Sequence, residues 1–120
     1  MDIGGVTLAL YHGAPWDHLE GRVYPDFGDW ERFNEVAADI ILMGHTHYSF
    51  TKVHGDKMII NPGSVGQARD RSGAACFAVL DLEARLVQHN RVPFDSQKLI
   101  EDAKQHDPDV PYLVEVLTRK

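Results

Sequence analysis

The sequence has little cysteine, no long hydrophobic run and no excess of basic residues. Cys76 is the single cysteine in 120 residues, which excludes a disulfide scaffold and a cysteine-rich metal site. No apolar run approaches the ~18 residues that a membrane-spanning helix needs, and residues 1–5 lack the basic region of a secretory signal. We therefore expect a cytoplasmic protein.

The charge balance is acidic, since 18 Asp and Glu face 12 Lys and Arg and give a formal net charge of −6. No basic stripe of the kind that binds nucleic acid is visible. The hydrophobic share of 43% and the charged share of 25% are those of an ordinary globular domain. A chain of this length buries enough surface for one core, so we expect residues 1–120 to form a single domain without a nucleic-acid or membrane partner.

The first half of the chain has the pattern of a strand, a helix and a second strand. Apolar, β-rich residues predict strands over residues 6–11 and 39–43, each buried on both faces. Apolar residues at helical spacing predict a helix over residues 30–38. Such a unit forms a right-handed parallel crossover, with its functional residues at the carboxyl ends of the strands. His12 and Gly44-His45-Thr46-His47 occupy those ends.

The second half of the chain predicts antiparallel hairpins and then helices. Hairpins are expected over residues 50–61 and 73–92, and helices over residues 95–105 and 111–118. The expected fold class is therefore α/β: a mixed sheet with one strand-helix-strand crossover, antiparallel hairpins and two carboxyl-terminal helices.

Three histidines at the strand ends are the main sign of chemistry. His45 and His47 are two residues apart, so their imidazoles point to the same side of an extended chain, and the crossover brings His12 near them. Three neutral imidazoles suit Zn²⁺ or another divalent ion that activates a water molecule. A histidine pair taken alone is more often structural. Four further histidines lie in less promising surroundings: His18, His54, His89 and His106.

Residues 61–70 (Asn-Pro-Gly-Ser-Val-Gly-Gln-Ala-Arg-Asp) are rich in turn formers and follow a predicted strand. The glycines and amides of this loop can surround an anion, with added positive charge, so Asn61, Gly63 and Arg69 are candidate phosphate or substrate contacts. A structural turn is the alternative, with the Asn61 side chain bonded to local backbone and Gly63 supplying a positive φ. The sequence leaves both open.

Together, His12-Gly13, Gly44-His45-Thr46-His47 and residues 61–70 resemble the calcineurin-like metallophosphoesterases, in particular the small bacterial and archaeal phosphodiesterase branch. The resemblance covers residues 3–82. It implies half of a two-sheet sandwich, a two-metal centre, and hydrolysis of phosphate mono- or diesters by metal-activated water. By motif, His12 and His45 are similar to ligands of one metal and His47 to a ligand of the other. The family's ions are manganese, iron or zinc.

The family's other motifs, Asp-x-His, Gly-Asp and Gly-Asn-His-Asp, do not precede His12. We therefore expect the chain to correspond to the carboxyl-terminal half of the family's domain, with one metal or fewer bound and no retained catalytic residue. Hydrolysis is expected to be weak or absent. Self-association, or pairing with an amino-terminal half, is expected to cover apolar surface. Two alternatives are a non-catalytic histidine metal-binding or assembly module and a mononuclear three-histidine zinc hydrolase.

Overall fold

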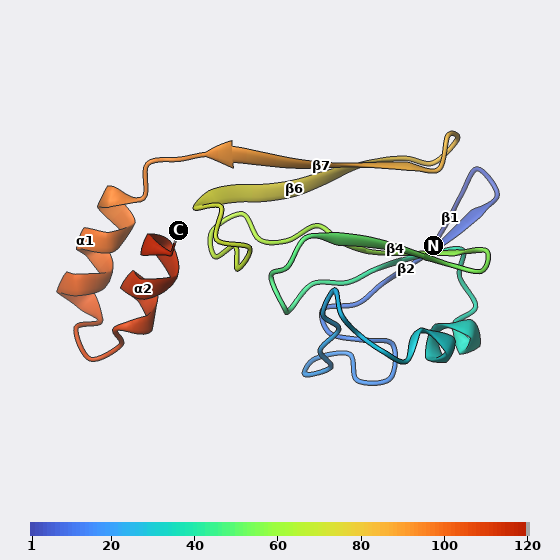
Figure 1. Cartoon of the computed structure of the whole chain (residues 1–120), viewed down its shortest axis with the longest axis horizontal. Helices are drawn as coiled ribbons and strands as arrows, with labels where there is room; N and C mark the ends of the chain where they lie inside the picture. Colours follow the sequence, from blue (N-terminus) through green and yellow to red (C-terminus); the bar gives the residue numbers. More distant parts are fainter. Residues whose placement is uncertain (120) are drawn as a thin grey trace.

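A computed structural model describes residues 1–119. Over these residues the strands form a five-stranded mixed sheet and a two-stranded antiparallel sheet, and a helical hairpin follows them (Figure 1). The strands and helices, in chain order, are β1 (Asp2–Ile3), β2 (Val6–Leu10), η1 (Trp30–Glu35), β3 (Ile40–Leu42), β4 (Phe50–His54), β5 (Lys57–Asn61), β6 (Ala74–Asp81), β7 (Leu86–Pro93), α1 (Gln97–His106) and α2 (Tyr112–Thr118).

The five-stranded sheet has the order β1-β2-β3-β5-β4. The predicted parallel crossover is confirmed, because Leu8, Ala9 and Leu10 of β2 lie opposite residues 40–42 of β3 in parallel register. The predicted β4–β5 hairpin is also present, and its second strand inserts parallel to β3. Three parallel strands therefore end at one edge of the sheet, where their carboxyl ends meet.

The segment predicted as a helix over residues 30–38 is a short 3₁₀ helix, Trp30–Glu35. Six residues are too few for a stable α-helix, and aromatic residues and Asn have low helix propensity. Val36 then leaves in an extended conformation, with φ −83° and ψ 121°. The predicted packing face is retained, since Phe33 is completely buried.

Strand β2 is not buried on both faces, contrary to the prediction from its composition. Leu8 is the one buried residue of this strand, and Leu10 is 59% exposed. The reason is its position near the edge of the sheet, where β1 pairs with Val6 and Thr7, and Met1 bonds to the Leu8 backbone. β1 does not extend along Ala9 and Leu10.

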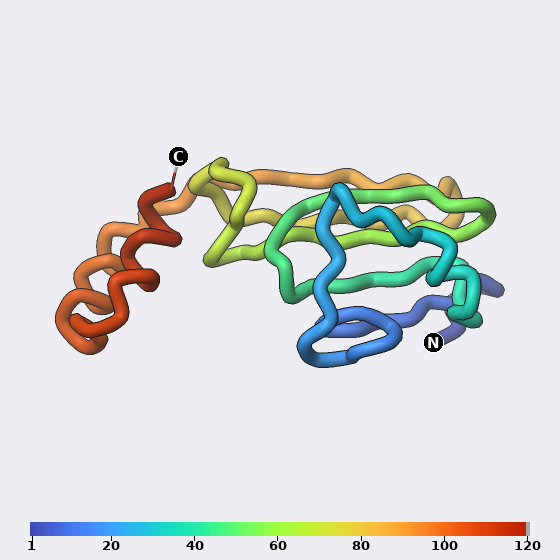
Figure 2. Tube along the Cα trace, turned by 60° about the horizontal axis from the view of Figure 1, so that its bottom comes forward, coloured from blue at the N-terminus to red at the C-terminus, as the bar shows by residue number. Residues whose placement is uncertain are grey.

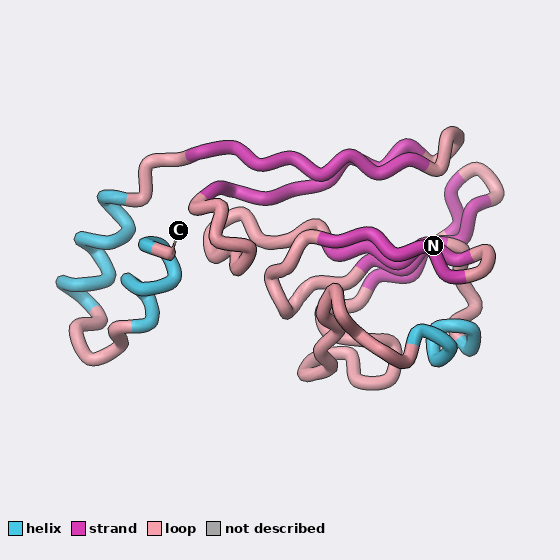
Figure 3. The backbone as a smooth tube through the Cα atoms, viewed as in Figure 1, coloured by secondary structure: helices cyan, strands magenta, loops and turns pink. Residues whose placement is uncertain are grey.

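The two faces of the sheet carry separate hydrophobic clusters. Ile41 and Ile59 belong to the cluster that packs against η1 and the loop before it. Ile40 and Ile60 belong to the opposite cluster, which includes Leu80 and other side chains of the β6–β7 hairpin. Figure 3 shows that hairpin as a second layer beside the five-stranded sheet.

The helical hairpin of α1 and α2 lies at one end of the molecule, and both Figure 1 and the rotated view in Figure 2 separate it from η1 at the other end. Both carboxyl-terminal helices were predicted, and α1 begins after Ser96, with the Gln97 amide bonded to Asp95 Oδ1 at 2.9 Å. α1 has no buried residue, and α2 buries Val116. Within residues 1–119, no helix is long and apolar enough to span a membrane.

An ion pair connects strand β7 to the loop that precedes β6. Arg91 Nε donates to Asp70 Oδ2 at 2.6 Å, and the Asp70 side chain is only 16% exposed. Burial alone raises the pKa of the Asp70 carboxyl, but hydrogen bonds from Ser72 and Arg91 outweigh burial and leave that pKa below its usual value. The stabilisation is therefore present above the carboxyl's unfolded pKa and is lost as the pH falls through the lowered folded pKa.

Asp70→Asn should lower the free energy of unfolding by about 1 kcal/mol at neutral pH, and by progressively less as the pH falls through the lowered pKa of the folded carboxyl. Urea titrations followed by circular dichroism at several pH values measure this difference. Asp102→Asn is the matched control, because its ion pair with Lys98 is exposed and should contribute little. A loss in Asp70→Asn that does not change with pH would contradict the assignment.

Candidate functional site

The structure brings His12 and His45 into direct contact. His12 follows β2 and His45 follows β3, and these strands are parallel neighbours. His12 Nε2 lies 2.9 Å from His45 Nδ1, with the ring planes at 70°. The two nitrogens face one another within hydrogen-bond distance at the carboxyl edge of the sheet, so one of them carries the proton that the pair shares.

The loop that carries His45 is held by buried hydrogen bonds. Asn61 is completely buried, and its Nδ2 donates to Gly44 O at 2.8 Å and to Thr46 Oγ1 at 3.1 Å. Thr46 Oγ1 in turn donates to Val23 O at 3.2 Å. His45 has a φ of 62° and His47 a φ of 61°. This left-handed conformation is strained for non-glycine residues, and such strain clusters at functional sites.

His47 is held by a different contact. Its Nδ1 lies 3.1 Å from Gln67 O, so the ring donates there and leaves Nε2 unprotonated in the neutral form. Burial lowers the pKa of His47, and the nearby charges of Arg69, His45 and His12 lower it further, against the raising effect of the Gln67 hydrogen bond. A neutral imidazole whose Nδ1–H is fixed by a carbonyl is the usual state of a metal-binding histidine.

The donor set fits part of a metal site. Two ligand nitrogens at ~2.0–2.1 Å from one tetrahedral ion are about 3.3 Å apart, so the His12 and His45 nitrogens, 2.9 Å apart, would have to separate by a few tenths of an ångström to bind the same ion. Over residues 1–119, however, no group of three or more His, Cys, Asp or Glu side chains is placed to hold an ion. His47 does not join His12 and His45 in such a group. A complete metal site would therefore need ligands other than His12, His45 and His47, carboxylates included.

Arg22 lies beside the histidine pair, and the sequence pattern gave no sign of it. Its Nε is 3.4 Å from His45 Nε2. The loop before it is tightly closed, because Gly13 N donates to His18 O at 2.7 Å and a Cβ at Gly13 would lie 2.6 Å from Asp17 O. Closely spaced glycines after a strand-end histidine are a weak signal of such a loop. The contact itself joins residues 23 apart and is set by the tertiary structure.

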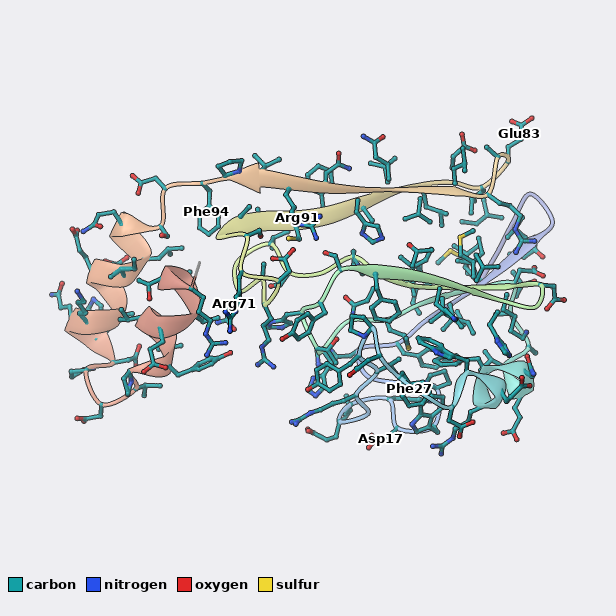
Figure 4. The ribbon with its side chains drawn as sticks, viewed as in Figure 1. Asp17, Phe27, Arg71, Glu83, Arg91 and Phe94 are labelled. Atoms are coloured by element: carbon teal, nitrogen blue, oxygen red, sulfur yellow. The ribbon has the colours of Figure 1, made fainter. Side chains whose placement is uncertain are left out.

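Asp17 and His18 belong to the same loop but do not join the pair. His18 Nε2 contacts Pro15 O at 3.1 Å, and Asp17 lies on the outer side of the loop in Figure 4. Two of the remaining histidines bond to side chains elsewhere: His54 lies 3.4 Å from Glu31, and His89 lies 2.8 Å from Thr51.

In the loop after β5, the geometry favours the structural alternative for two of the three candidates. Asn61 Oδ1 accepts from Gly63 N at 2.9 Å, so the Asn61 amide uses both its donor and its acceptor within the fold. Gly63 has a φ of 91°, as the turn requires. Arg69 is different, because its backbone N donates to His47 O at 3.2 Å while its guanidinium reaches Tyr112 Oη at 3.0 Å.

Imidazoles at the carboxyl ends of parallel strands, on a strained and well-held loop, define a candidate metal-binding site in an α/β fold. The sequence matches the profile described as "Calcineurin-like phosphoesterase superfamily domain" over residues 1–85. The chain belongs to the calcineurin-like phosphoesterase superfamily. The superfamily is one of phosphoesterases, and the matched Bacillus protein is described as a probable metallophosphoesterase.

Curated relatives match the chain, and they include a protein named a probable metallophosphoesterase. The chain is 34% identical over 83 residues to the probable metallophosphoesterase YsnB of Bacillus subtilis, covering 69% of this chain and 46% of that protein. It is 32% identical to the uncharacterized protein MJ0912 of Methanocaldococcus jannaschii, covering 83% of this chain and 46% of that protein. The chain thus spans about half the length of these relatives.

Solved structures share the fold. The hypothetical protein PH1004 of Pyrococcus horikoshii has a TM-score of 0.79 at 23% identity, covering 98% of this chain and 48% of that chain. A metallophosphoesterase of Sphaerobacter thermophilus has a TM-score of 0.78 at 22% identity, covering 95% of this chain and 55% of that chain. At these identities the likeness concerns the fold alone, and it extends over nearly the whole chain.

Proposed function

We propose that this chain forms the histidine-bearing part of a metal-dependent phosphoesterase centre. In this proposal His12 and His45 bind one divalent ion, and His47 is a ligand of a neighbouring one. The observation that carries the proposal is the 2.9 Å contact between His12 Nε2 and His45 Nδ1 at the carboxyl edge of the sheet. Imidazole suits zinc and iron, and manganese enters the proposal through the family resemblance and would need added oxygen ligands.

A bound ion of this kind supplies a Lewis acid and lowers the pKa of a coordinated water. The chain's own residues prepare the site for it. His12 Nε2 and His45 Nδ1 lie within hydrogen-bond distance of one another, and Gln67 O fixes His47 in the form that leaves Nε2 free. Arg22 adds a guanidinium next to the pair, where it can contact an anionic substrate. Asn61 holds the loop that carries His45, because its Nδ2 donates to Gly44 O.

The number of protein ligands available to the metal ions determines how much hydrolysis we expect. Two dications side by side repel one another, and carboxylate ligands normally offset that repulsion. Over residues 1–119 the histidines have no carboxylate that completes a metal group. We therefore expect one ion or fewer per chain and weak or absent hydrolysis from the chain by itself. This same observation favours a non-catalytic metal-binding module as the second candidate.

The proposal includes a partner polypeptide, either a second copy or an amino-terminal half. A cavity of about 420 Å³ lies between the two sheets and is lined largely by apolar residues, among them Leu42, Ile60 and Val87. Leu10, which also lines this cavity, is 59% exposed. Apolar surface of this kind is typical of an interaction site.

The test uses protein purified without chelators or a histidine tag. Elemental analysis gives the metal content, hydrolysis of bis-p-nitrophenyl phosphate gives the activity, and sedimentation velocity of the same sample gives the assembly state. We expect about one ion per chain, with hydrolysis rising in assembled fractions. Bound metal without hydrolysis in any fraction would favour the non-catalytic module. A chain that binds no ion in any fraction, assembled or not, when manganese, iron or zinc is supplied would contradict the proposal.

A further inference from the structure

Arginines gather around Tyr112, where the loop after β5 meets α2. Arg69 Nη2 donates to Tyr112 Oη at 3.0 Å, and Arg119 Cζ lies 5.4 Å from the centroid of the Tyr112 ring. The loop and the end of α2 are adjacent, since a Cβ at Gly73 would lie 3.8 Å from Arg119 O. Figure 4 shows Arg71 in the same region, between the loop and α2.

These positive charges have no carboxylate partner in the part of the chain that the structure describes. Its ion pairs are His54–Glu31, Arg91–Asp70 and Lys98–Asp102. Asp70 follows Arg69 in the sequence, but it is engaged by Arg91 at 2.6 Å. Like charges around one ring repel one another, and an anion placed among them would relieve that repulsion.

Arg69 also has unused hydrogen-bonding capacity. A guanidinium carries five N–H groups, and the described residues provide one partner for its side chain, Tyr112 Oη. Arg69 Nε is shielded from solvent and has no acceptor among residues 1–119. Buried polar groups nearly always have a partner, so this donor indicates an acceptor that residues 1–119 do not supply, either a water molecule or the oxygen of an anion. Because Tyr112 Oη accepts from Arg69, its own O–H is available to donate.

We propose that Arg69, Arg119 and Tyr112 form a phosphate-binding subsite beside the histidines. Planar guanidinium groups bind phosphate oxygens in a bidentate manner, and a tyrosine hydroxyl adds a further donor. The subsite adjoins the metal-binding loop, because Arg69 N donates to His47 O at 3.2 Å. The inference deepens the proposed function: a second phosphoryl group of a diphosphate-bearing ester binds here while the scissile ester lies at the histidines. Inorganic phosphate released by hydrolysis carries the same oxygen acceptors and is the other ligand that these donors fit.

A purely structural role for these contacts predicts something different. If Arg69 and Tyr112 only fasten α2, their substitution changes the stability of the chain and leaves anion binding unaltered. The two roles are therefore separated by measuring stability and binding on the same variants.

The experiment is calorimetric titration of the metal-free full chain with inorganic pyrophosphate and with inorganic phosphate. Arg119→Gln and Arg69→Gln should each weaken binding about tenfold, the effect of losing one charge-assisted hydrogen bond. Arg119 is exposed, so its substitution should leave the fold intact, and Tyr112→Phe removes only the hydroxyl. Arg85→Gln is the matched control, because this arginine lies on the β6–β7 turn and donates to Asp56 O.

Tighter binding of pyrophosphate than of phosphate would assign the subsite to a second phosphoryl group, and equal binding would assign it to free phosphate. Three results would overturn the proposal: no binding by the wild type, wild-type binding by both arginine variants, or an equal loss in Arg85→Gln. A loss in His12→Ala with none in Arg119→Gln would also overturn it, by moving the anion to the histidine pair. The titration needs no metal and no turnover, so its failure is distinguishable from failure of the proposed function.

Discussion

Replacing His45 by alanine should weaken divalent-metal binding by about 100-fold or more. Even the loss of a residue that only supports a ligand lowers metal affinity ~10–100-fold, and this change removes a direct ligand. The reason is geometric, since His12 Nε2 and His45 Nδ1 meet at 2.9 Å and the remaining imidazole cannot chelate alone. Competition against a chromophoric zinc chelator measures the affinity of wild type and variant under the same conditions.

A second variant distinguishes the loss of a metal ligand from a change in the conformation of the loop that carries His45. His45 has a φ of 62°, and Asn tolerates that conformation better than most residues, so His45→Asn keeps the backbone while removing the imidazole. His54→Ala is the matched control, because His54 contacts Glu31 and lies outside the site. Wild-type affinity in both His45 variants would show that the histidine pair is not the metal site.

Replacing Asn61 by alanine should lower the free energy of unfolding by about 3–4 kcal/mol. Its side chain is completely buried and bonds to Gly44 O, Thr46 Oγ1 and Gly63 N. Each buried group left without a partner costs about 1–3 kcal/mol. Guanidinium chloride unfolding followed by circular dichroism measures the change. Metal affinity should fall as well, because Asn61 holds the carbonyl directly before His45.

Two further variants make this prediction specific. Asn61→Asp keeps the acceptor for Gly63 N but places an oxygen opposite Gly44 O, so it should also be strongly destabilised. Asn34→Ala is the control, since the Asn34 amide is exposed and bonds only to Glu31; its effect should stay within about 0.5 kcal/mol. A change below about 1 kcal/mol in Asn61→Ala would show that the buried network is not what holds the loop.

The periodic parts of the fold were predictable from the sequence. The β4–β5 hairpin and the β2–β3 crossover follow from hydrophobic runs, turn residues and chain length. The 3₁₀ form of Trp30–Glu35 and the exposure of Leu10 were not. Composition gives the secondary-structure preference of a segment. The length of a helix and the exposure of a strand residue depend instead on the elements that pack against them.

The site was predicted in part, for a similar reason. The position of His12 and His45 at strand ends followed from the crossover, because parallel strands present their carboxyl ends at one edge. Arg69 was proposed as a phosphate contact from loop composition, and its bond to Tyr112 was not foreseen. Composition identifies a loop as polar and basic, but it does not say which distant element the arginine reaches.

By itself, the sequence determined the family, the main strands and three motifs: His12-Gly13, residues 44–47 and the loop of residues 61–70. Each of these is a property of neighbouring residues and their spacing. Only the tertiary structure decided that His12 meets His45, that Arg22 lies beside them and that Arg69 reaches α2. These contacts join residues far apart in the chain. They depend on strand register, on loop conformation and on left-handed backbone at His45, and a hydrophobic pattern specifies none of these.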